Sequence, residues 1–223
     1  MKGFDYGREM LKWLAIITMT VDHVGAVLYT EIDVLRWIGR LAFPLFAYLL
    51  ILGMENTRNV RNYFVRLFVF ALISQVPFFL AIDHAPFDLF NIFFTLASGL
   101  VFIHYFKKGS LFAFVPVVVS IIIPFDYGIY GIALIGCMYI LRKDTKIGVA
   151  SLVLLNSLFL FPFQSQILSL AAIPFIVLHK TGYLSIIRKK EEKFSIPLWR
   201  KYFFYAYYPI HLAILYLIRV TYF

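Results

Sequence analysis

Two adjacent polar residues interrupt the first long apolar segment of the chain. Asp22 and His23 lie within "TMTVDHVGAV", among residues that are otherwise typical of a membrane-spanning helix. Ionisable side chains in such a helix are costly, and they usually face the bundle interior or a water-filled cavity. Histidine is the side chain best suited to take a proton from an amine or hydroxyl near neutral pH. We therefore predict that His23 is a general base.

The spacing of Lys12 and His23 predicts what this base acts on. Lys12 precedes His23 by almost three complete helical turns, so both side chains project from one helix face. The two positions are about 16 Å apart along the helix axis. This geometry suits a long donor with an anionic head near Lys12 and a reactive end near His23. Acyl-coenzyme A has this form, because its pantetheine arm separates the phosphates from the thioester.

Two more ionisable residues are predicted to lie within spans. Arg40 is expected at a depth close to that of Asp22, so the two are predicted to pair, which would leave His23 free for chemistry. Arg40 could instead extend towards the outer interface. His211, in "YYPIHL", lies near mid-depth of the last span. It is a candidate catalytic residue, and the alternative is a structural hydrogen bond between helices.

Weaker candidates lie near the ends of the predicted spans. Three of them could contact the acceptor or help to stabilise charge: Gln75, Asn91 and Asp126. For Asp126, a helix N-cap is the favoured alternative. Three basic residues could join Lys12 in holding donor phosphates: Arg58, Arg61 and Arg66. The single cysteine excludes a Cys-based metal cluster, and no metal site is predicted.

The elements that must position these residues follow from composition. The chain has 223 residues, of which 62% are hydrophobic and 15% charged, and its mean hydropathy is +0.84. Soluble domains are roughly 45–50% apolar. A soluble fold of this size could not bury so much apolar surface. We therefore predict an all-α, polytopic membrane helix bundle that forms a single domain over residues 1–223, with a retained first segment.

About nine spans are predicted, at 11–30, 34–54, 61–82, 91–106, 111–124, 126–142, 147–162, 166–179 and 201–221. Most of the 21 basic residues lie on one set of span ends, including a basic loop at about 180–200. Because basic loops stay cytoplasmic, the N-terminus is predicted inside and the C-terminus outside. This distribution accounts for the net charge of +9 without nucleic acid. The loop is predicted to form an amphipathic helix against anionic lipid.

Several segments together resemble the TraX family: "LKWLAIITMTVDHVGAVLY", "GRLAFPLF", "NIFFTLASGL", "DYGIYGIALI" and "YYPIHL". The resemblance runs from about 11 to 142 and again over 201–215. It implies a protein of the bacterial cell (inner) membrane, in a family associated with N-acetylation of a conjugative pilin subunit. The family also looks related to transmembrane acyltransferases that carry an Arg-x10-His pattern in their first span. Lys12 and His23 match that spacing, with Lys replacing Arg.

The sequence and the resemblance lead to one principal expectation and two rivals. The principal expectation is a membrane acyltransferase that moves an acetyl or short acyl group from cytoplasmic acetyl-CoA to an amine or hydroxyl acceptor. The acceptor stays open among a protein or peptide N-terminus, a glycan and a lipid. One rival is a proton-coupled transporter or flippase that uses Asp22, His23 and Arg40. The other is a non-enzymatic membrane subunit of a conjugation or secretion machine.

Overall fold

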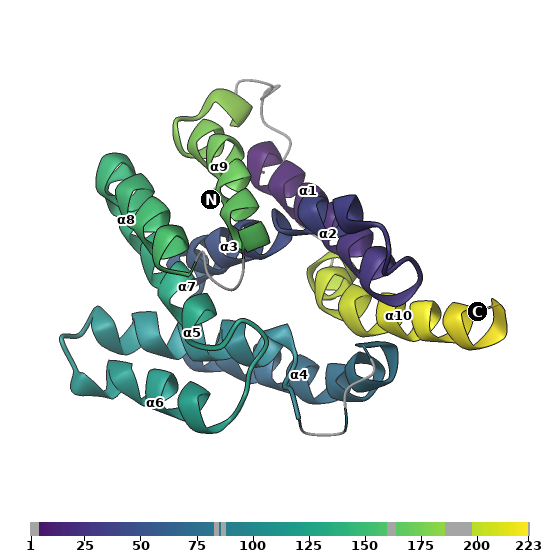
Figure 1. The fold of residues 1–223 in the computed structure, drawn as a ribbon. Coiled ribbons are helices and arrows are strands. Elements are labelled where there is room, and N and C mark those ends of the chain that lie inside the picture. Colours follow the sequence, from purple (N-terminus) through teal and green to yellow (C-terminus); the bar gives the residue numbers. More distant parts are fainter. Residues whose placement is uncertain (1–4, 83–84, 86–87, 160–163, 186–197, 223) are drawn as a thin grey trace.

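The computed structural model describes residues 5–82, 85, 88–159, 164–185 and 198–222. These ranges are helical apart from turns, short connections and one isolated bridge between Phe90 and Phe125 (Figure 1). The helices in chain order are α1 (Tyr6–Val27), α2 (Asp33–Gly39), α3 (Ala42–Asn56), α4 (Val60–Ile82), α5 (Ile92–Phe106), η1 (Leu111–Phe114), α6 (Val115–Ile122), α7 (Gly128–Lys143), α8 (Thr145–Leu158), η2 (Gln164–Ala172), α9 (Ile173–Lys180), η3 (Tyr183–Ser185) and α10 (Leu198–Tyr222). The predicted all-α helix bundle is confirmed.

The surface of the bundle is apolar along its long helices. Ile17 on α1, Leu72 on α4 and Leu217 on α10 are all more than half exposed. Extended apolar surface of this kind marks contact with lipid or another apolar partner. Four helical segments are long and apolar enough to cross a membrane, namely Tyr6–Val27, Asp33–Asn56, Val60–Ile82 and Tyr202–Tyr222. The long apolar helices and the apolar surface are therefore those expected of a membrane protein.

The predicted span 34–54 is two helices rather than one. Helix α2 ends at Gly39 and α3 begins at Ala42, and the break falls at Arg40 and Leu41. Pro44 explains this position, because a proline cannot donate to the carbonyl four residues earlier and its ring clashes with that carbonyl. The carbonyl in question belongs to Arg40. Pro44 therefore favours a break at this point, and the chain turns at residues that line the cavity.

The predicted span 111–124 is also shorter than expected. It consists of η1, with 4 residues, and α6, with 8 residues. Their combined length is about 18 Å, whereas the hydrocarbon core of a bilayer is about 30 Å thick. Pro116 starts α6 and Pro124 follows its end. This segment packs against α5 as the short arm of a hairpin.

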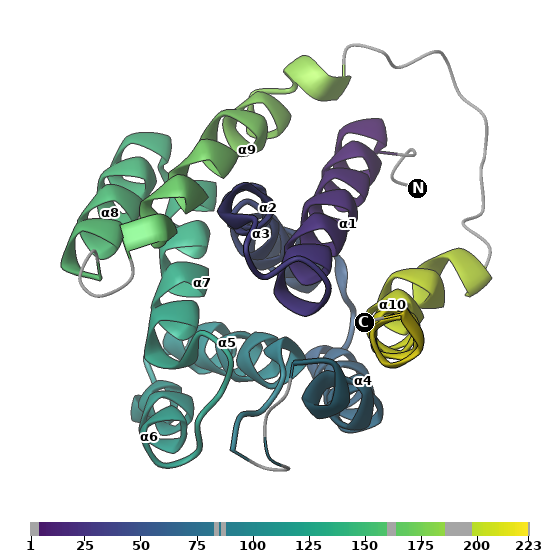
Figure 2. The same ribbon diagram turned by 45° about the vertical axis from the view of Figure 1, so that its right-hand side comes forward.

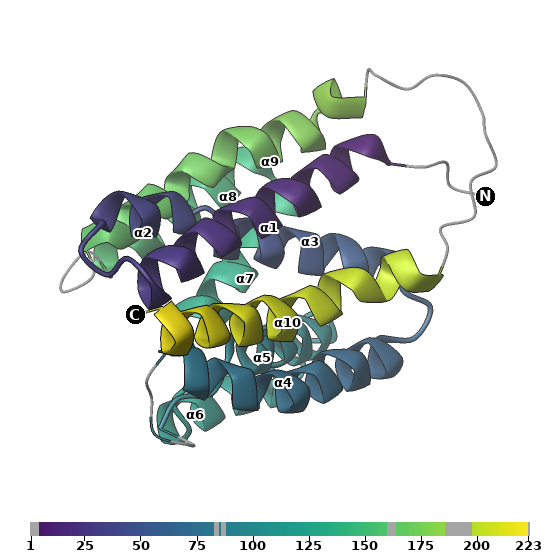
Figure 3. The same cartoon turned by 90° about the vertical axis from the view of Figure 1, so that its right-hand side faces the viewer.

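The long helices share two ends. The beginnings of α1, α4 and α10 lie at one end, and α2 and the end of α10 lie at the other (Figure 3). We call these the inner and outer ends, following the predicted orientation. Helix α1 lies between α9 and α10 and packs on α3 (Figure 2). Most of the predicted basic loop, residues 186–197, lies outside the described residues.

Candidate active site

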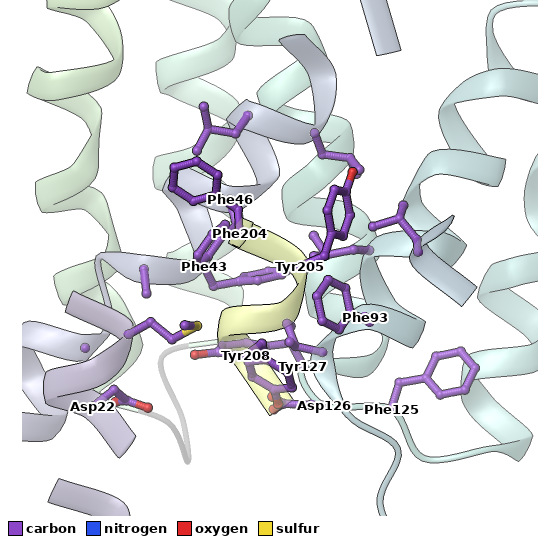
Figure 4. Close-up of a pocket in the computed structure, with 18 of the residues that line it drawn as sticks. Asp22, Phe43, Phe46, Phe93, Phe125, Asp126, Tyr127, Phe204, Tyr205 and Tyr208 are labelled. Atoms are coloured by element: carbon purple, nitrogen blue, oxygen red, sulfur yellow. The ribbon is translucent and has the colours of Figure 1, made fainter. Parts of the chain in front are cut away.

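A cavity of about 1440 Å³ lies between the helices that carry the predicted site residues. Its volume exceeds the roughly 300–1,000 Å³ that is usual for a small-ligand pocket. Aromatic side chains line its middle, where they gather from α3, α5 and α10 (Figure 4): Phe43, Phe46, Phe93, Phe204 and Tyr205. Charged side chains line both ends: Asp5, Arg8, Glu9, Lys12 and Arg66 at the inner end, and Asp22, Arg36, Arg40 and Asp126 at the outer end.

His23 and His211 form a hydrogen-bonded pair between the first and last helices. The Nδ1 atom of His23 lies 2.6 Å from Nε2 of His211, and the rings stack with centroids 4.9 Å apart. His23 lines the cavity, whereas His211 stands behind it with only 6% of its surface exposed. The packing of α10 on α1 brings the two together from opposite ends of the sequence. The structure thus unites the two predicted catalytic histidines.

The hydrogen bonds around this pair define which ring nitrogens carry protons. Nδ1 of His211 lies 2.8 Å from the carbonyl oxygen of Tyr207. A carbonyl only accepts, so this nitrogen must donate, and in the neutral ring Nε2 is then an acceptor. That acceptor receives the proton of His23 Nδ1. Neutral His23 is therefore protonated at Nδ1, and its Nε2 lone pair has no hydrogen-bond donor among the described residues.

Aromatic and hydroxyl groups hold the pair in place. The Tyr207 ring stacks on His211 with centroids 5.0 Å apart, and its hydroxyl lies 2.8 Å from Thr20 Oγ1 on α1. The Tyr208 ring stands edge-on to His23 with centroids 5.8 Å apart. These are further contacts between α1 and α10 beside the histidine pair. They restrict rotation of the His23 ring.

The ion pair of Asp22 corrects the sequence prediction. Its Oδ2 accepts from Arg36 Nη1 at 2.6 Å, and the same nitrogen donates to the Asp22 backbone carbonyl at 3.0 Å. The predicted partner, Arg40, makes no ion pair with Asp22. Gly39 makes the close approach of α2 possible, because a Cβ atom there would lie 2.0 Å from Asp22 Oδ1. The pair fixes α2 against α1, and the partner of Asp22 lies four residues before the predicted Arg40.

Arg40 faces the cavity beside the start of α7. Its Nη1 donates to the Tyr127 hydroxyl at 3.5 Å, a long contact, and its Nε is buried without a partner among the described residues. Tyr127 has a φ of 63°, which bulky side chains rarely adopt. The stacking of its ring on Phe43, with centroids 4.4 Å apart, supports that conformation. Arg40 is thus a cavity cation that makes no ion pair in the described part of the chain.

Asp126 also lines the cavity, but it is not the predicted helix N-cap. Tyr127 occupies the N-cap position of α7, without a side-chain capping bond. The backbone of Asp126 is fixed on both sides, because its N–H donates to Phe90 O at 2.7 Å and its carbonyl accepts from Thr95 Oγ1. A loop held this firmly keeps the carboxylate at the outer end of the cavity, where Asp22 also lies (Figure 4).

Gln75 and Asn91 do not line the cavity, which corrects their predicted role in substrate binding. The Gln75 amide donates to Leu89 O at 2.8 Å and accepts from Asn91 Nδ2 at 2.8 Å. Asn91 Nδ2 also donates to Ala71 O, and its Oδ1 caps α5 by accepting from Phe93 N–H. Because their hydrogen-bonding groups are used in this way, the two residues join α4 to the start of α5.

At the inner end, the predicted phosphate-binding residues divide into two groups. Lys12 and Arg66 line the cavity, whereas Arg58 and Arg61 are exposed and lie outside it. Lys12 already has a counter-ion, because its Nζ lies 2.6 Å from Glu9 Oε1. The prediction omitted Arg8, which lines the same end. Its spacing of four residues from Lys12 was the available signal, since residues at i and i+4 share a helix face.

Comparison with known proteins gives the family. The family model described as TraX protein matches residues 7–219. This chain belongs to the TraX family. The matched range includes both His23 and His211.

Three individual relatives match over different shares of the chain. The chain is 29% identical to the probable fimbrial assembly protein FimC, serogroup H1, of Dichelobacter nodosus, over 96% of both chains. It is 25% identical to protein TraX of Escherichia coli, over 93% of this chain and 85% of that protein. It is 31% identical to an uncharacterised protein of Rickettsia prowazekii (strain Madrid E), over 61% of this chain and 56% of that protein. No solved structure matches the chain.

Proposed function

We propose that this TraX-family protein is a membrane acyltransferase that uses acetyl-CoA or a short-chain acyl-CoA from the cytoplasm. The observation that carries the proposal is the tautomer of His23, whose bare Nε2 belongs to a residue that lines a large cavity. A side chain held in this way is suited to accept a proton. The cavity also reaches a cationic inner end, where an anionic donor would bind. We place the protein in the inner membrane, with several spans.

The proposed reaction is a direct transfer. His23 Nε2 removes a proton from the acceptor amine or hydroxyl as that atom attacks the thioester carbonyl carbon. The new C–N or C–O bond forms and the C–S bond breaks, so that the acyl group moves and the coenzyme A thiolate leaves. The thiolate then takes the proton from His23. His211 is a positioning residue in this scheme, because it acts on the reacting atoms only through His23.

Arg40 is our candidate for stabilising the negative oxygen of the tetrahedral intermediate. Two other polar residues are less suited to this task, because Gln75 is bonded within the α4–α5 link and His211 is bonded to His23 and Tyr207. Arg40 keeps a cation at the cavity wall and makes no ion pair in the described ranges. A cation aimed at developing charge in a site shielded from water is an effective source of transition-state stabilisation.

The names of the relatives bear on the acceptor. One relative is named for fimbrial assembly and another is TraX. A surface-fibre subunit or another secreted polypeptide is therefore the first acceptor that we would test. Family membership does not identify the acceptor, because one fold can serve different substrates and function must be argued from the site.

The test is transfer of labelled acetyl groups from acetyl-CoA by the purified full-length protein, with His23→Ala as the variant. Loss of a general base is expected to lower kcat about 10²–10⁴-fold. His104→Ala is the matched control, because His104 lies on α5 outside the cavity, and its rate should stay at the wild-type level. Transfer that persists in His23→Ala would remove the proposed base. Uptake of a substrate by proteoliposomes without donor turnover would favour the transporter instead.

A further inference from the structure

Three basic side chains converge on the inner end of the cavity. Arg8 and Lys12 lie one turn apart on the same face of α1, and Arg66 approaches from α4. The described carboxylates that line this end are Asp5 and Glu9. The three cations do not have equivalent surroundings, and the difference determines which of them can hold an additional anion.

Lys12 is the cation whose charge is already used. Its ammonium lies 2.6 Å from Glu9 Oε1 and 4.8 Å from the centre of the Phe204 ring. Glu9 is buried, with 8% of its surface exposed, so this ion pair is only weakly screened by water. An anion that bound Lys12 would have to compete with a carboxylate already in contact. Lys12 is therefore suited to neutralising Glu9 and packing on Phe204.

Arg8 and Arg66 have no such counter-ion. Neither makes an ion pair with a described carboxylate, and the Nε atom of each is buried without a hydrogen-bond partner in the described ranges. Arg66 lies over the Tyr63 ring, with its Cζ 5.3 Å from the ring centre. A half-buried guanidinium N–H without an acceptor is costly, and a phosphate oxygen is an acceptor that would complete its hydrogen bonds.

Asp5 does not supply the missing anion. Its Oδ1 accepts from the Arg8 backbone N–H at 2.9 Å, and its Oδ2 lies 3.4 Å from Nε2 of His179. The hydrogen bond from His179, with a further contribution from the Arg8 backbone, lowers the pKa of the Asp5 carboxyl to about 2. Asp5 is therefore charged at neutral pH and directed at the α1 backbone and α9. The Arg8 guanidinium is attracted to this carboxylate but forms no ion pair with it, so its Nε–H remains available for another anion.

We infer that Arg8 and Arg66, rather than Lys12, form a phosphate-binding site at the inner end of the cavity. The planar guanidinium fork matches two phosphate oxygens at once, which an ammonium does not. If the proposed function holds, the ligand is the phosphate-bearing part of the acyl-CoA donor. Arg8 precedes His23 by fifteen residues on one unbroken helix, which is about 22 Å along its axis. The pantetheine arm would lie along the aromatic middle of the cavity.

The position of the two arginines favours a soluble donor over a lipid headgroup. Both line the cavity, whereas Arg58 and Arg61, on the same end of the molecule, are exposed outside it. Exposed basic residues at a membrane surface are the ones expected to meet anionic lipid phosphates. Arg61 and Arg66 also lie on the same helix, so Arg61→Gln removes the same charge from α4 without touching the cavity. It is the matched control.

The experiment measures binding without turnover. Calorimetry on the full-length protein in neutral detergent would compare coenzyme A with pantetheine, which lacks the phosphates. Wild-type protein and Arg61→Gln should bind coenzyme A with equal affinity. Arg66→Gln and Arg8→Gln should each weaken it about tenfold or more, since a hydrogen bond to a charged group contributes about 1.5–3 kcal/mol. The coenzyme A affinity of Arg66→Lys should lie between those of wild type and Arg66→Gln. Lys12→Gln should lose less coenzyme A affinity than either Arg8→Gln or Arg66→Gln. Pantetheine affinity should not change in any of these variants.

Three results would overturn the inference. The first is equal coenzyme A affinity in wild type and Arg66→Gln. The second is a loss of coenzyme A affinity in Arg61→Gln as large as that in Arg66→Gln. The third is a greater loss of coenzyme A affinity in Lys12→Gln than in Arg8→Gln and Arg66→Gln. Thermal unfolding in nanodiscs tests the lipid source. Arg66-dependent stabilisation by phosphatidylglycerol, without stabilisation by coenzyme A, would assign the site to a headgroup and reject the donor. Arg66-dependent binding without any acetyl transfer would instead keep the site and reject the proposed function.

Discussion

Replacing His211 with alanine separates positioning from catalysis most clearly. The variant removes the acceptor that keeps the proton of His23 on Nδ1, and with it the reason why Nε2 is bare. The lost hydrogen bond alone is worth about 0.5–1.5 kcal/mol, or up to about tenfold in rate. Loss of the correct histidine tautomer in a serine protease triad costs about 10⁴-fold. Because water can enter the space and accept from His23, we expect kcat to fall about a hundredfold.

The Michaelis constant should respond differently. His211 does not line the cavity, so KM for acetyl-CoA should stay within about twofold of wild type. His211→Gln supplies a side-chain oxygen that can accept from His23 Nδ1, and it should recover part of the lost kcat. The assay is initial-rate acetyl transfer at varied acetyl-CoA, with melting temperatures measured in parallel. An unchanged kcat in His211→Ala would refute the tautomer argument. Equal kcat in the Ala and Gln variants would show that His211 serves only to join α1 and α10.

Two further predictions concern the elements around the site. Gly39→Ala places a Cβ 2.0 Å from Asp22 Oδ1, so the Asp22–Arg36 pair must shift, at a cost of about 1–3 kcal/mol. Thermal unfolding should show the loss for Gly39→Ala but not for Gly136→Ala, whose new Cβ would meet only Phe102 at 3.4 Å. Gln75→Ala removes the donor to the Leu89 carbonyl and the acceptor of the Asn91 backbone N–H, which should cost about 1–3 kcal/mol of stability. Its acceptor KM should match wild type, and a large rise in KM would restore the substrate-binding role.

The sequence predicted the helices well because hydrophobicity determines where a membrane helix runs. Each predicted span corresponds to helical structure, including the short spans at 91–106 and 147–162, which correspond to α5 and α8. The exceptions arise from proline. Pro44 breaks the second span at Arg40, and Pro116 and Pro124 bound the short α6. These prolines were visible in the sequence, but their consequence depends on which carbonyl each one faces.

Partners of individual side chains were harder to predict, because they depend on helix rotation. The pairing of Asp22 with Arg40 was argued from depth along a continuous second helix. The break at Arg40 removes that premise, and Arg36 on α2 takes the position instead. A similar limit applies to α4. Arg61 and Arg66 are five residues apart, which separates their directions by about 140° around the helix, so only one can face the cavity. The clustering of Lys and Arg at the inner span ends does not show which of these residues face the cavity.

The rigidity of α1 connects the two ends of the proposed site. Arg8, Lys12 and His23 all lie on this single helix of 22 residues, so the distance between the cationic end and the base cannot vary with loop motion. A donor fixed by its phosphates at Arg8 and Arg66 therefore presents a group to His23 only if its arm has the right length. Acetyl-pantetheine lacks the anchored part, so we expect it to show both a higher KM and a lower kcat than acetyl-CoA. Helix α10 completes the arrangement, because it places His211 behind the base. In this proposal, α1 sets a fixed distance between the basic inner end and the histidine pair, and the donor must match that distance.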